Sequence, residues 1–211
     1  MEKRNWKHIV TLKQRMVLCL AAFFAAFALQ LALNGYQARA VQQVQDDQMG
    51  NFNAISRFQG GVESSISILE AYRWENGETE EMLEKLQAAC STSNAWLWRI
   101  RSNMDGLQNV SDEQWVLYGA VETTYGSYNT LLEELESYLS SGQEAKASQL
   151  YYNKVSVCGG YLSQYTMQLL KASILDAQTT YTEISELGER IALMQTVVVA
   201  LCVALGCASG L

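Results

Sequence analysis

Two clusters of carboxylates are the first residues of this chain whose types and spacing suggest chemistry. Glu80, Glu81 and Glu84 form one cluster, and the second lies within residues 133–136. Carboxylates grouped on one helix face can attract cations, but neither cluster has the Glu-x-x-His partner of a di-metal bundle. Two interpretations stay open, a solvated helix face and a cation-sensitive ligand site.

Catalytic motifs are missing from the sequence. The only histidine is His8, and there is no Walker loop, no GxSxG and no HExxH. An enzyme needs a nucleophile, an acid-base pair, a metal or a cofactor cradle. We therefore predict that the chain as given is not an enzyme, with no catalytic residue, no metal site and no cofactor.

A tryptophan next to two arginines is the second candidate ligand site. Trp96 and Trp98 are two residues apart, so on a helix they point in nearly opposite directions, and the apolar face leaves Trp98 outward. An outward Trp98 beside Arg99 and Arg101 suits a ligand lip or a dimer contact. Simple surface exposure is the alternative.

Five cysteines are distributed unevenly. Cys19, Cys202 and Cys207 lie in apolar runs, where a thiol is most often a small packing residue. Cys90 and Cys158 lie outside these runs. They could form a disulfide in an exported domain, although a disulfide framework would show more cysteines. Bonded and free thiols both stay open.

Uncharged apolar runs lie at both ends of the chain. We predict transmembrane helices at 16–33 and 191–211, since each run could cross about 30 Å of hydrocarbon. The basic segment 1–15 then lies in the cytoplasm and segment 34–190 outside it. This predicts a multi-pass protein of the inner (cytoplasmic) membrane, in contact with the lipid bilayer, whose chain is cut off at its cytoplasmic end.

A cleaved signal peptide is the rival interpretation of the N-terminal run. Residues 38–40, Ala-Arg-Ala, have the form of a cleavage site and follow a basic segment and an apolar one. The run is longer than a usual signal-peptide core, which favours an uncleaved anchor.

The middle of the chain is acidic. Segment 34–190 holds 10 Lys and Arg against 21 Asp and Glu. Nucleic acid requires cationic partners, so we predict no nucleic-acid binding. The charge favours a small molecule, a cation or a cationic peptide as ligand, without identifying it.

Apolar residues at helical spacing and the absence of proline predict helices throughout the middle. The clearest seam comprises Tyr118, Val121, Tyr125, Tyr128, Leu132, Leu135 and Leu139. Four such helices with short turns predict an all-α fold, an antiparallel up-down-up-down four-helix bundle. Its first and last helices are expected to continue into the two transmembrane helices.

Several residue patterns predict where these helices begin and end. The first ends at 76–77, Asn-Gly, and the second begins near Thr79. Ser111 and Gln114 form a capping box, and the pattern recurs at Ser141 with Glu144. The third helix ends at residues 140–142, Ser-Ser-Gly. The two glycines at 159–160 are expected to break or kink the last helix.

One apolar seam joins the first and last helices near the membrane. It comprises Val41, Val44, Ile184, Gly188 and Ile191. Two helices cannot bury apolar residues on every side, so we predict that the seam packs against a second copy in a homodimer and transmits a signal. Pairing within one chain is the alternative.

The order of these segments, apolar span, long helix, short helical pair, long helix and apolar span, resembles the sensory region of bacterial sensor histidine kinases and chemoreceptors. The resemblance covers the whole chain but depends on architecture alone, and it assigns no ligand residue. It implies a membrane receptor input module for a two-component histidine kinase, in a full-length parent with kinase activity, or for a chemoreceptor. The alternative is a surface-anchored helical interaction or scaffold protein.

Overall fold

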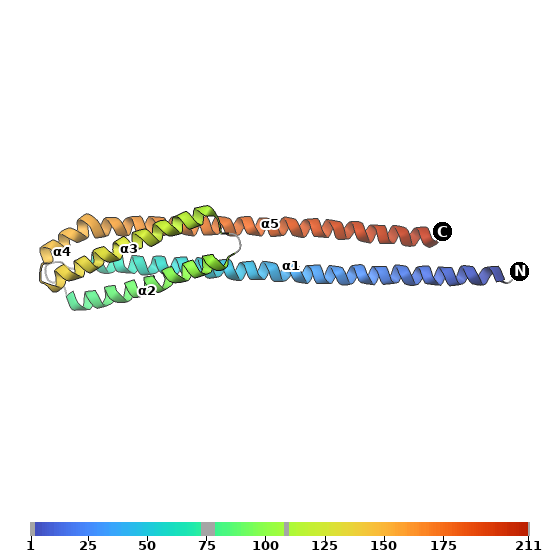
Figure 1. Ribbon diagram of the computed structural model, residues 1–211, viewed down its shortest axis with the longest axis horizontal. Coiled ribbons are helices and arrows are strands. Elements are labelled where there is room, and N and C mark those ends of the chain that lie inside the picture. Colours follow the sequence, from blue (N-terminus) through green and yellow to red (C-terminus); the bar gives the residue numbers. More distant parts are fainter. Residues whose placement is uncertain (1–2, 73–78, 108–109, 211) are drawn as a thin grey trace. The chain divides into compact units, whose positions relative to one another are not determined.

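The computed structural model describes residues 3–72, 79–107 and 110–210, apart from some side chains before residue 23 and after residue 201. All its elements are helical (Figure 1). They are α1 (Lys3–Ala71), α2 (Thr79–Gly106), α3 (Asp112–Ser140), α4 (Glu144–Leu150), the π-helix η1 (Tyr151–Val155) and α5 (Ser156–Gly210). The all-α prediction and the start of the second helix near Thr79 are confirmed. The predicted end at 76–77 lies outside the described residues.

The predicted membrane spans do not hold. A helix needs about 20 consecutive, mostly apolar residues to cross a bilayer. Within the described parts of the helices, no segment combines that length with that apolarity. The transmembrane helices at 16–33 and 191–211 are therefore wrong. The multi-pass inner-membrane location and the membrane-receptor function that depended on them are wrong as well.

The chain divides into two units. The first, here called the helix-pair unit, comprises Met1–Val44 and Thr180–Leu211. The second, here called the bundle unit, comprises Gln45–Thr179. These boundaries differ from the predicted domain 34–190, because the residues at both of its ends group with the helix-pair unit.

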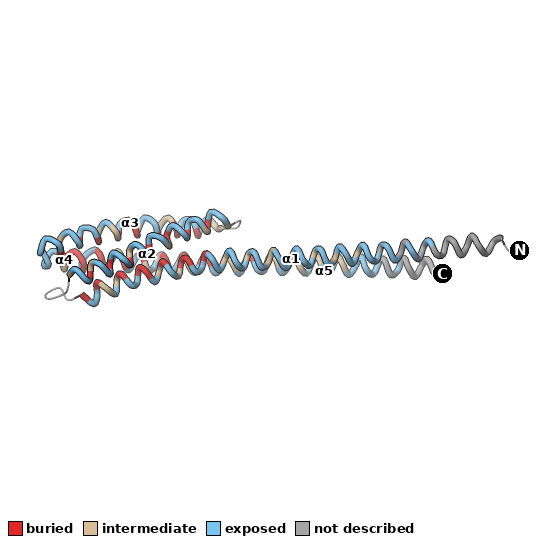
Figure 2. The backbone as a smooth tube through the Cα atoms, turned by 90° about the horizontal axis from the view of Figure 1, so that it is seen from below, coloured by how far each residue is buried: buried red, intermediate tan, exposed pale blue. Residues whose placement is uncertain are grey.

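A single apolar core holds the bundle unit together, and Figure 2 shows the buried residues along the inward faces of its helices. The core includes Ala54, Ile55, Phe58, Val62 and Leu69 from α1; Met82, Leu86, Leu97, Ile100 and Met104 from α2; Tyr118, Val121, Tyr125, Tyr128, Leu132, Leu135 and Leu139 from α3; and Ala147, Leu150, Val155, Leu162 and Leu169 from α4, η1 and α5. Every residue of the predicted third-helix seam is buried.

The contacts between α2 and α3 show that these helices run in opposite directions. The hydroxyl of Tyr125 donates to the Cys90 carbonyl at 2.8 Å, and the side chains of Arg101 and Glu122 lie 3.5 Å apart. From the first contact to the second, the residue number rises on α2, from 90 to 101, and falls on α3, from 125 to 122. An antiparallel pair follows.

Two contacts show the same for α3 and α5. The backbone N–H of Ser111 donates to Asp176 Oδ2 at 3.2 Å, and the Cys158 thiol contacts the Thr124 carbonyl with 3.7 Å between sulfur and oxygen. Early residues of α3 therefore meet later residues of α5.

The N-terminus of α3 confirms half of the predicted capping box. Ser111 is the N-cap and accepts from the backbone N–H of Gln114 at 3.3 Å. The reciprocal bond is replaced, because Asp176 accepts the Ser111 N–H and the Gln114 side chain is buried instead. Docking of α5 therefore completes the start of α3.

The turn after α3 corrects a second capping prediction. Ser141 is the C-cap of α3, and its hydroxyl donates to the Ser137 carbonyl at 2.8 Å. The N-cap of α4 is Gln143, without a side-chain capping bond. Gly142 has a φ of 71°, a conformation that favours glycine. The predicted end of the third helix at 140–142 is confirmed.

The last helix is irregular at a different place from the one predicted. Residues 159–160 lie inside the α-helix α5, and the wider π-helical turn η1 immediately precedes α5. A Cβ added at Gly159 would lie 3.1 Å from Ile66 Cδ1 and 3.3 Å from Tyr128 Cε2. Gly159 therefore permits close packing in the bundle core.

The predicted dimer seam is used within the helix-pair unit. Val41, Val44, Ile184, Gly188 and Ile191 are all half-buried there. A Cβ added at Gly188 would lie 3.3 Å from the side-chain nitrogen of Gln37, so the two segments are in contact at this point. The seam thus contributes to pairing within one chain, and because its residues stay partly exposed, the homodimer remains a prediction.

Candidate ligand groove

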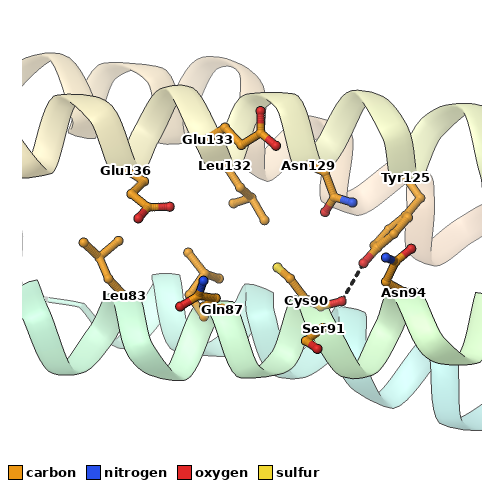
Figure 3. Close-up of a pocket in the computed structure, with 11 residues that line it drawn as sticks. Leu83, Gln87, Cys90, Ser91, Asn94, Tyr125, Asn129, Leu132, Glu133 and Glu136 are labelled. Atoms are coloured by element: carbon orange, nitrogen blue, oxygen red, sulfur yellow. Dashed lines mark hydrogen bonds between the residues drawn. The ribbon is translucent and has the colours of Figure 1, made fainter.

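Two rows of polar side chains, one on α2 and one on α3, line the gap between these helices. Their members recur at steps of four and then three residues: Gln87, Ser91 and Asn94 on α2, and Asn129, Glu133 and Glu136 on α3. Side chains at these steps lie on one helix face. The ion pair between Arg101 and Glu122 sets the register of the antiparallel helices. In the close-up of Figure 3, Asn94 lies beside Tyr125, and Asn129 lies nearer to Cys90.

A groove with a volume of about 400 Å³ lies between the two rows (Figure 3). Leu83, Leu86 and Leu132 give it an apolar wall, and the remaining lining comes from the polar rows with Cys90 and Tyr125. In Figure 3 the carboxylate of Glu136 points across the gap toward α2. The volume falls within the range of about 300–1,000 Å³ that is typical of small-molecule sites.

Hydrogen bonds position one end of the groove. The Tyr125 ring is buried, and its hydroxyl donates to the Cys90 carbonyl, which ties α3 to α2. Asn129 Oδ1 is also buried, but no hydrogen-bond partner for it lies within the described part of the chain. A buried acceptor without a partner is costly. A hydrogen bond from a water molecule or a ligand would therefore stabilise this oxygen.

The ionisable groups at this end are kept neutral. Burial, with a smaller contribution from the carboxylate of Glu136, raises the pKa of the Cys90 thiol to about 11. Burial likewise raises the pKa of Tyr125 to about 12. Nucleophilic attack by cysteine requires the thiolate, so Cys90 is a poor nucleophile at neutral pH. The groove is equipped for binding by charge and hydrogen bonds.

The predicted tryptophan site lies away from the groove. Trp98 is 68% exposed, which confirms that it faces outward, and Arg99 is exposed beside it. Arg101 instead forms the ion pair with Glu122 that links α2 to α3. None of the three predicted residues lines the groove.

The first acidic cluster also lies outside the groove lining. Glu80, Glu81 and Glu84 are exposed on the first turns of α2, and Glu81 forms an ion pair with Lys85 one turn later. The second cluster does contribute, since Glu133 and Glu136 line the groove while Glu134 does not. Glu134 instead accepts a hydrogen bond from the Tyr138 hydroxyl at 3.1 Å.

Cys90 and Cys158, for which a disulfide stayed open, are free thiols. Cys90 is on α2 and lines the groove, whereas Cys158 is on α5 and contacts the Thr124 carbonyl of α3. Burial raises the pKa of Cys158 as well.

Sequence reasoning missed most of the groove. Gln87, Ser91, Asn94 and Asn129 are ordinary polar helix residues when each is considered alone. The available signal was the matching step of four and three on two helices that were expected to be antiparallel neighbours. Combining that step with the predicted pairing would have placed the two rows opposite each other.

Among the residues that the structure describes, no three His, Cys, Asp or Glu side chains are grouped to hold a metal ion. Comparisons of this chain with protein-family models, with curated proteins and with solved structures found no match.

Proposed function

We propose that the bundle unit is an up-down-up-down four-helix bundle that binds a small organic cation in the groove between α2 and α3. The observation that carries this proposal is the groove itself, with the Glu136 carboxylate at one end and the buried Asn129 Oδ1 toward the other. The antiparallel contacts of α2 with α3, and of α3 with α5, support the topology.

Charge supports a cationic ligand. The described residues that line the groove include Glu133 and Glu136 but no Lys or Arg. The bundle unit as a whole has 18 Asp and Glu against 8 Lys and Arg. A field of one sign concentrates ligands of the opposite charge near the surface.

The spacing along α3 indicates the length of the ligand. Asn129 and Glu136 are seven residues apart, and at 1.5 Å per residue this separates them by about 10 Å along the helix. A ligand that engages both needs a cationic nitrogen at one end and a hydrogen-bond donor at the other. The leucine wall between them suits an aliphatic linker, so a linear polyamine fits all three requirements.

The test is a calorimetric titration of the full chain with spermidine. We expect Glu136→Gln to weaken spermidine binding about fivefold, since one charge-assisted hydrogen bond contributes about 1 kcal/mol at a partly exposed site. Glu134→Gln is the matched control, because it removes the same charge from the same helix outside the groove. 1,8-Octanediol, a neutral molecule of similar length, should bind more weakly than spermidine.

Equal losses in the two glutamate variants would refute the groove as the binding site and leave only general attraction by the acidic surface. Failure of spermidine to bind the unaltered chain would refute the polyamine proposal outright.

A second function is supported by the surface of the helix-pair unit. Phe23, Phe24, Phe27, Leu193 and Met194 are each more than half exposed. Exposed large apolar side chains in one unit mark an interaction site. We propose that a second copy of the chain covers it, because two helix pairs can form a four-helix assembly with one shared core.

Sedimentation of the full chain tests this second proposal. We expect a dimer that Phe27→Lys dissociates, whereas Val116→Lys, at an exposed apolar position of α3, leaves the dimer intact. A monomer that co-sediments with phosphatidylcholine vesicles would show that lipid covers the surface, and would refute self-association.

A further inference from the structure

Three buried polar residues of the bundle unit carry side-chain atoms that have no hydrogen-bond partner among the described residues. Asn51 is 0% exposed, Gln114 is 1% exposed and Ser173 is 3% exposed. The atoms without partners are Asn51 Nδ2 and Oδ1, Gln114 Oε1 and Ser173 Oγ. Each belongs to a different helix, namely α1, α3 and α5.

Contacts elsewhere in the bundle place these three residues at one level. Ser111, before α3, contacts Asp176 on α5. Gln114 lies three residues after Ser111, and Ser173 lies three residues before Asp176. Gly159 on α5 lies beside Ile66 on α1. Asn51 lies fifteen residues before Ile66, and Ile174, next to Ser173, lies fifteen residues after Gly159. Residue counting from these contacts therefore places the three buried residues at about one level of the bundle.

The capping arrangement explains why Gln114 belongs to this group. In a complete capping box its side chain would accept the backbone N–H of Ser111. Asp176 accepts that N–H instead, so Gln114 Oε1 is left inside the bundle without a partner. The substitution of one acceptor for another thus creates a buried hydrogen-bonding group.

The mixture of donors and acceptors indicates what these three residues bind. Asn51 Nδ2 can only donate, Asn51 Oδ1 and Gln114 Oε1 can only accept, and Ser173 Oγ can do either. A cation would leave the Asn51 N–H groups unsatisfied, and an anion would leave the two amide oxygens unsatisfied. Water donates two hydrogen bonds and accepts two, and buried waters typically bridge two to four polar groups.

We propose that Asn51, Gln114 and Ser173 form an internal hydration site, which holds ordered water that bridges α1, α3 and α5. The site is distinct from the groove between α2 and α3, since none of its residues lines that groove. Its occupant is part of the folded structure and links three helices at one level of the core.

Water-to-protein NMR cross-relaxation on the full, isotope-labelled chain tests the site. We expect the Asn51 side-chain amide to show cross-relaxation with water in both the laboratory frame and the rotating frame. The two effects should have opposite signs, which is the signature of water that stays bound for longer than a nanosecond. Gln59 is the control, because its exposed amide donates to Glu63 at 2.8 Å and should show only short-lived surface water. The measurement on the unaltered chain decides the matter without any variant.

Two variants locate the water. Asn51→Leu should abolish the long-lived water signal at the Gln114 amide, while Asn129→Leu, in the groove, should leave it unchanged. Short-lived water at Asn51 in the unaltered chain would overturn the proposal. A crystal structure in which the three side chains hydrogen-bond directly to each other would also overturn it.

Discussion

Two adjacent glycines in α1 give a sharp test of how closely α1 and α2 pack. A Cβ added at Gly61 would lie 2.3 Å from Ser93 Oγ and 3.5 Å from the Ala89 carbonyl oxygen. A Cβ added at Gly60 would meet nothing within 4 Å. The Ser93 hydroxyl is buried and donates to the Ala89 carbonyl at 3.0 Å. To admit a methyl group at Gly61, Ser93 must rotate out of this bond or the helices must separate.

The two alanine variants should therefore change stability in opposite directions. Each gains about 1 kcal/mol from the higher helix propensity of alanine. Gly60→Ala keeps that gain. Gly61→Ala also suffers overpacking, which costs about 1–3 kcal/mol in a filled core, so its net effect should be a loss of up to about 2 kcal/mol. Urea unfolding followed by circular dichroism measures both changes in the free energy of unfolding.

A third variant shows whether Ser93 is the cause. Ser93→Ala removes the oxygen that a Cβ at Gly61 would meet, so Gly61→Ala should cost less in that background than in the unaltered chain. The energies of the single and double variants form a double-mutant cycle. If Gly61→Ala proved as stable as Gly60→Ala, the close approach of α1 and α2 would be refuted.

Three further predictions concern single residues. Ser111→Ala should lower the free energy of unfolding by about 1 kcal/mol through loss of the N-cap, measured by urea unfolding, whereas no change would exclude its capping role. Tyr128→Phe should lower the free energy of unfolding by about 1 kcal/mol in the same assay, because the Tyr128 hydroxyl shares a buried 3.0 Å hydrogen bond with Ser65. An unchanged free energy of unfolding would show that this bond makes no net contribution. Iodoacetamide labelling of Cys90, resolved by mass spectrometry, should be slow at pH 8 and increase toward pH 11, because burial and Glu136 raise the pKa of this thiol. Glu136→Gln should shift that profile to lower pH, and rapid labelling of the unaltered chain at pH 8 would contradict the predicted protonation state. Since the pKa of Cys90 is raised from 9.0 to about 11 on folding, its contribution to stability should be intact below pH 9 and decline between pH 9 and 11.

Much of the bundle could be predicted from local sequence patterns. The seam from Tyr118 to Leu139 repeats apolar residues at helical steps, and burial of one face follows directly from that period. Ser111 and the residues at 140–142 mark helix ends through local backbone chemistry, which a sequence displays openly. These features involve residues that are close in the chain.

The features that were missed depend on residues distant in the chain. Asp176 replaces the expected capping partner of Ser111, and only the docking of α5 on α3 brings the two together. The groove requires the register between α2 and α3, and Asn129 becomes notable only when its oxygen is seen to be buried without a partner. The membrane interpretation depended on two uncharged apolar runs and the basic segment before the first, whereas no segment of the described helices is long and apolar enough to cross a bilayer.

The π-helical turn at Tyr151–Val155 has a consequence for variation in the length of the chain. Such a turn accommodates one more residue than a regular α-helical turn. Removing one residue there could restore the regular helix while the side chains on either side keep their core contacts. Homologous chains that are one residue shorter should therefore have their gap within this turn, and deletions elsewhere in α5 should rotate its apolar face by about 100°.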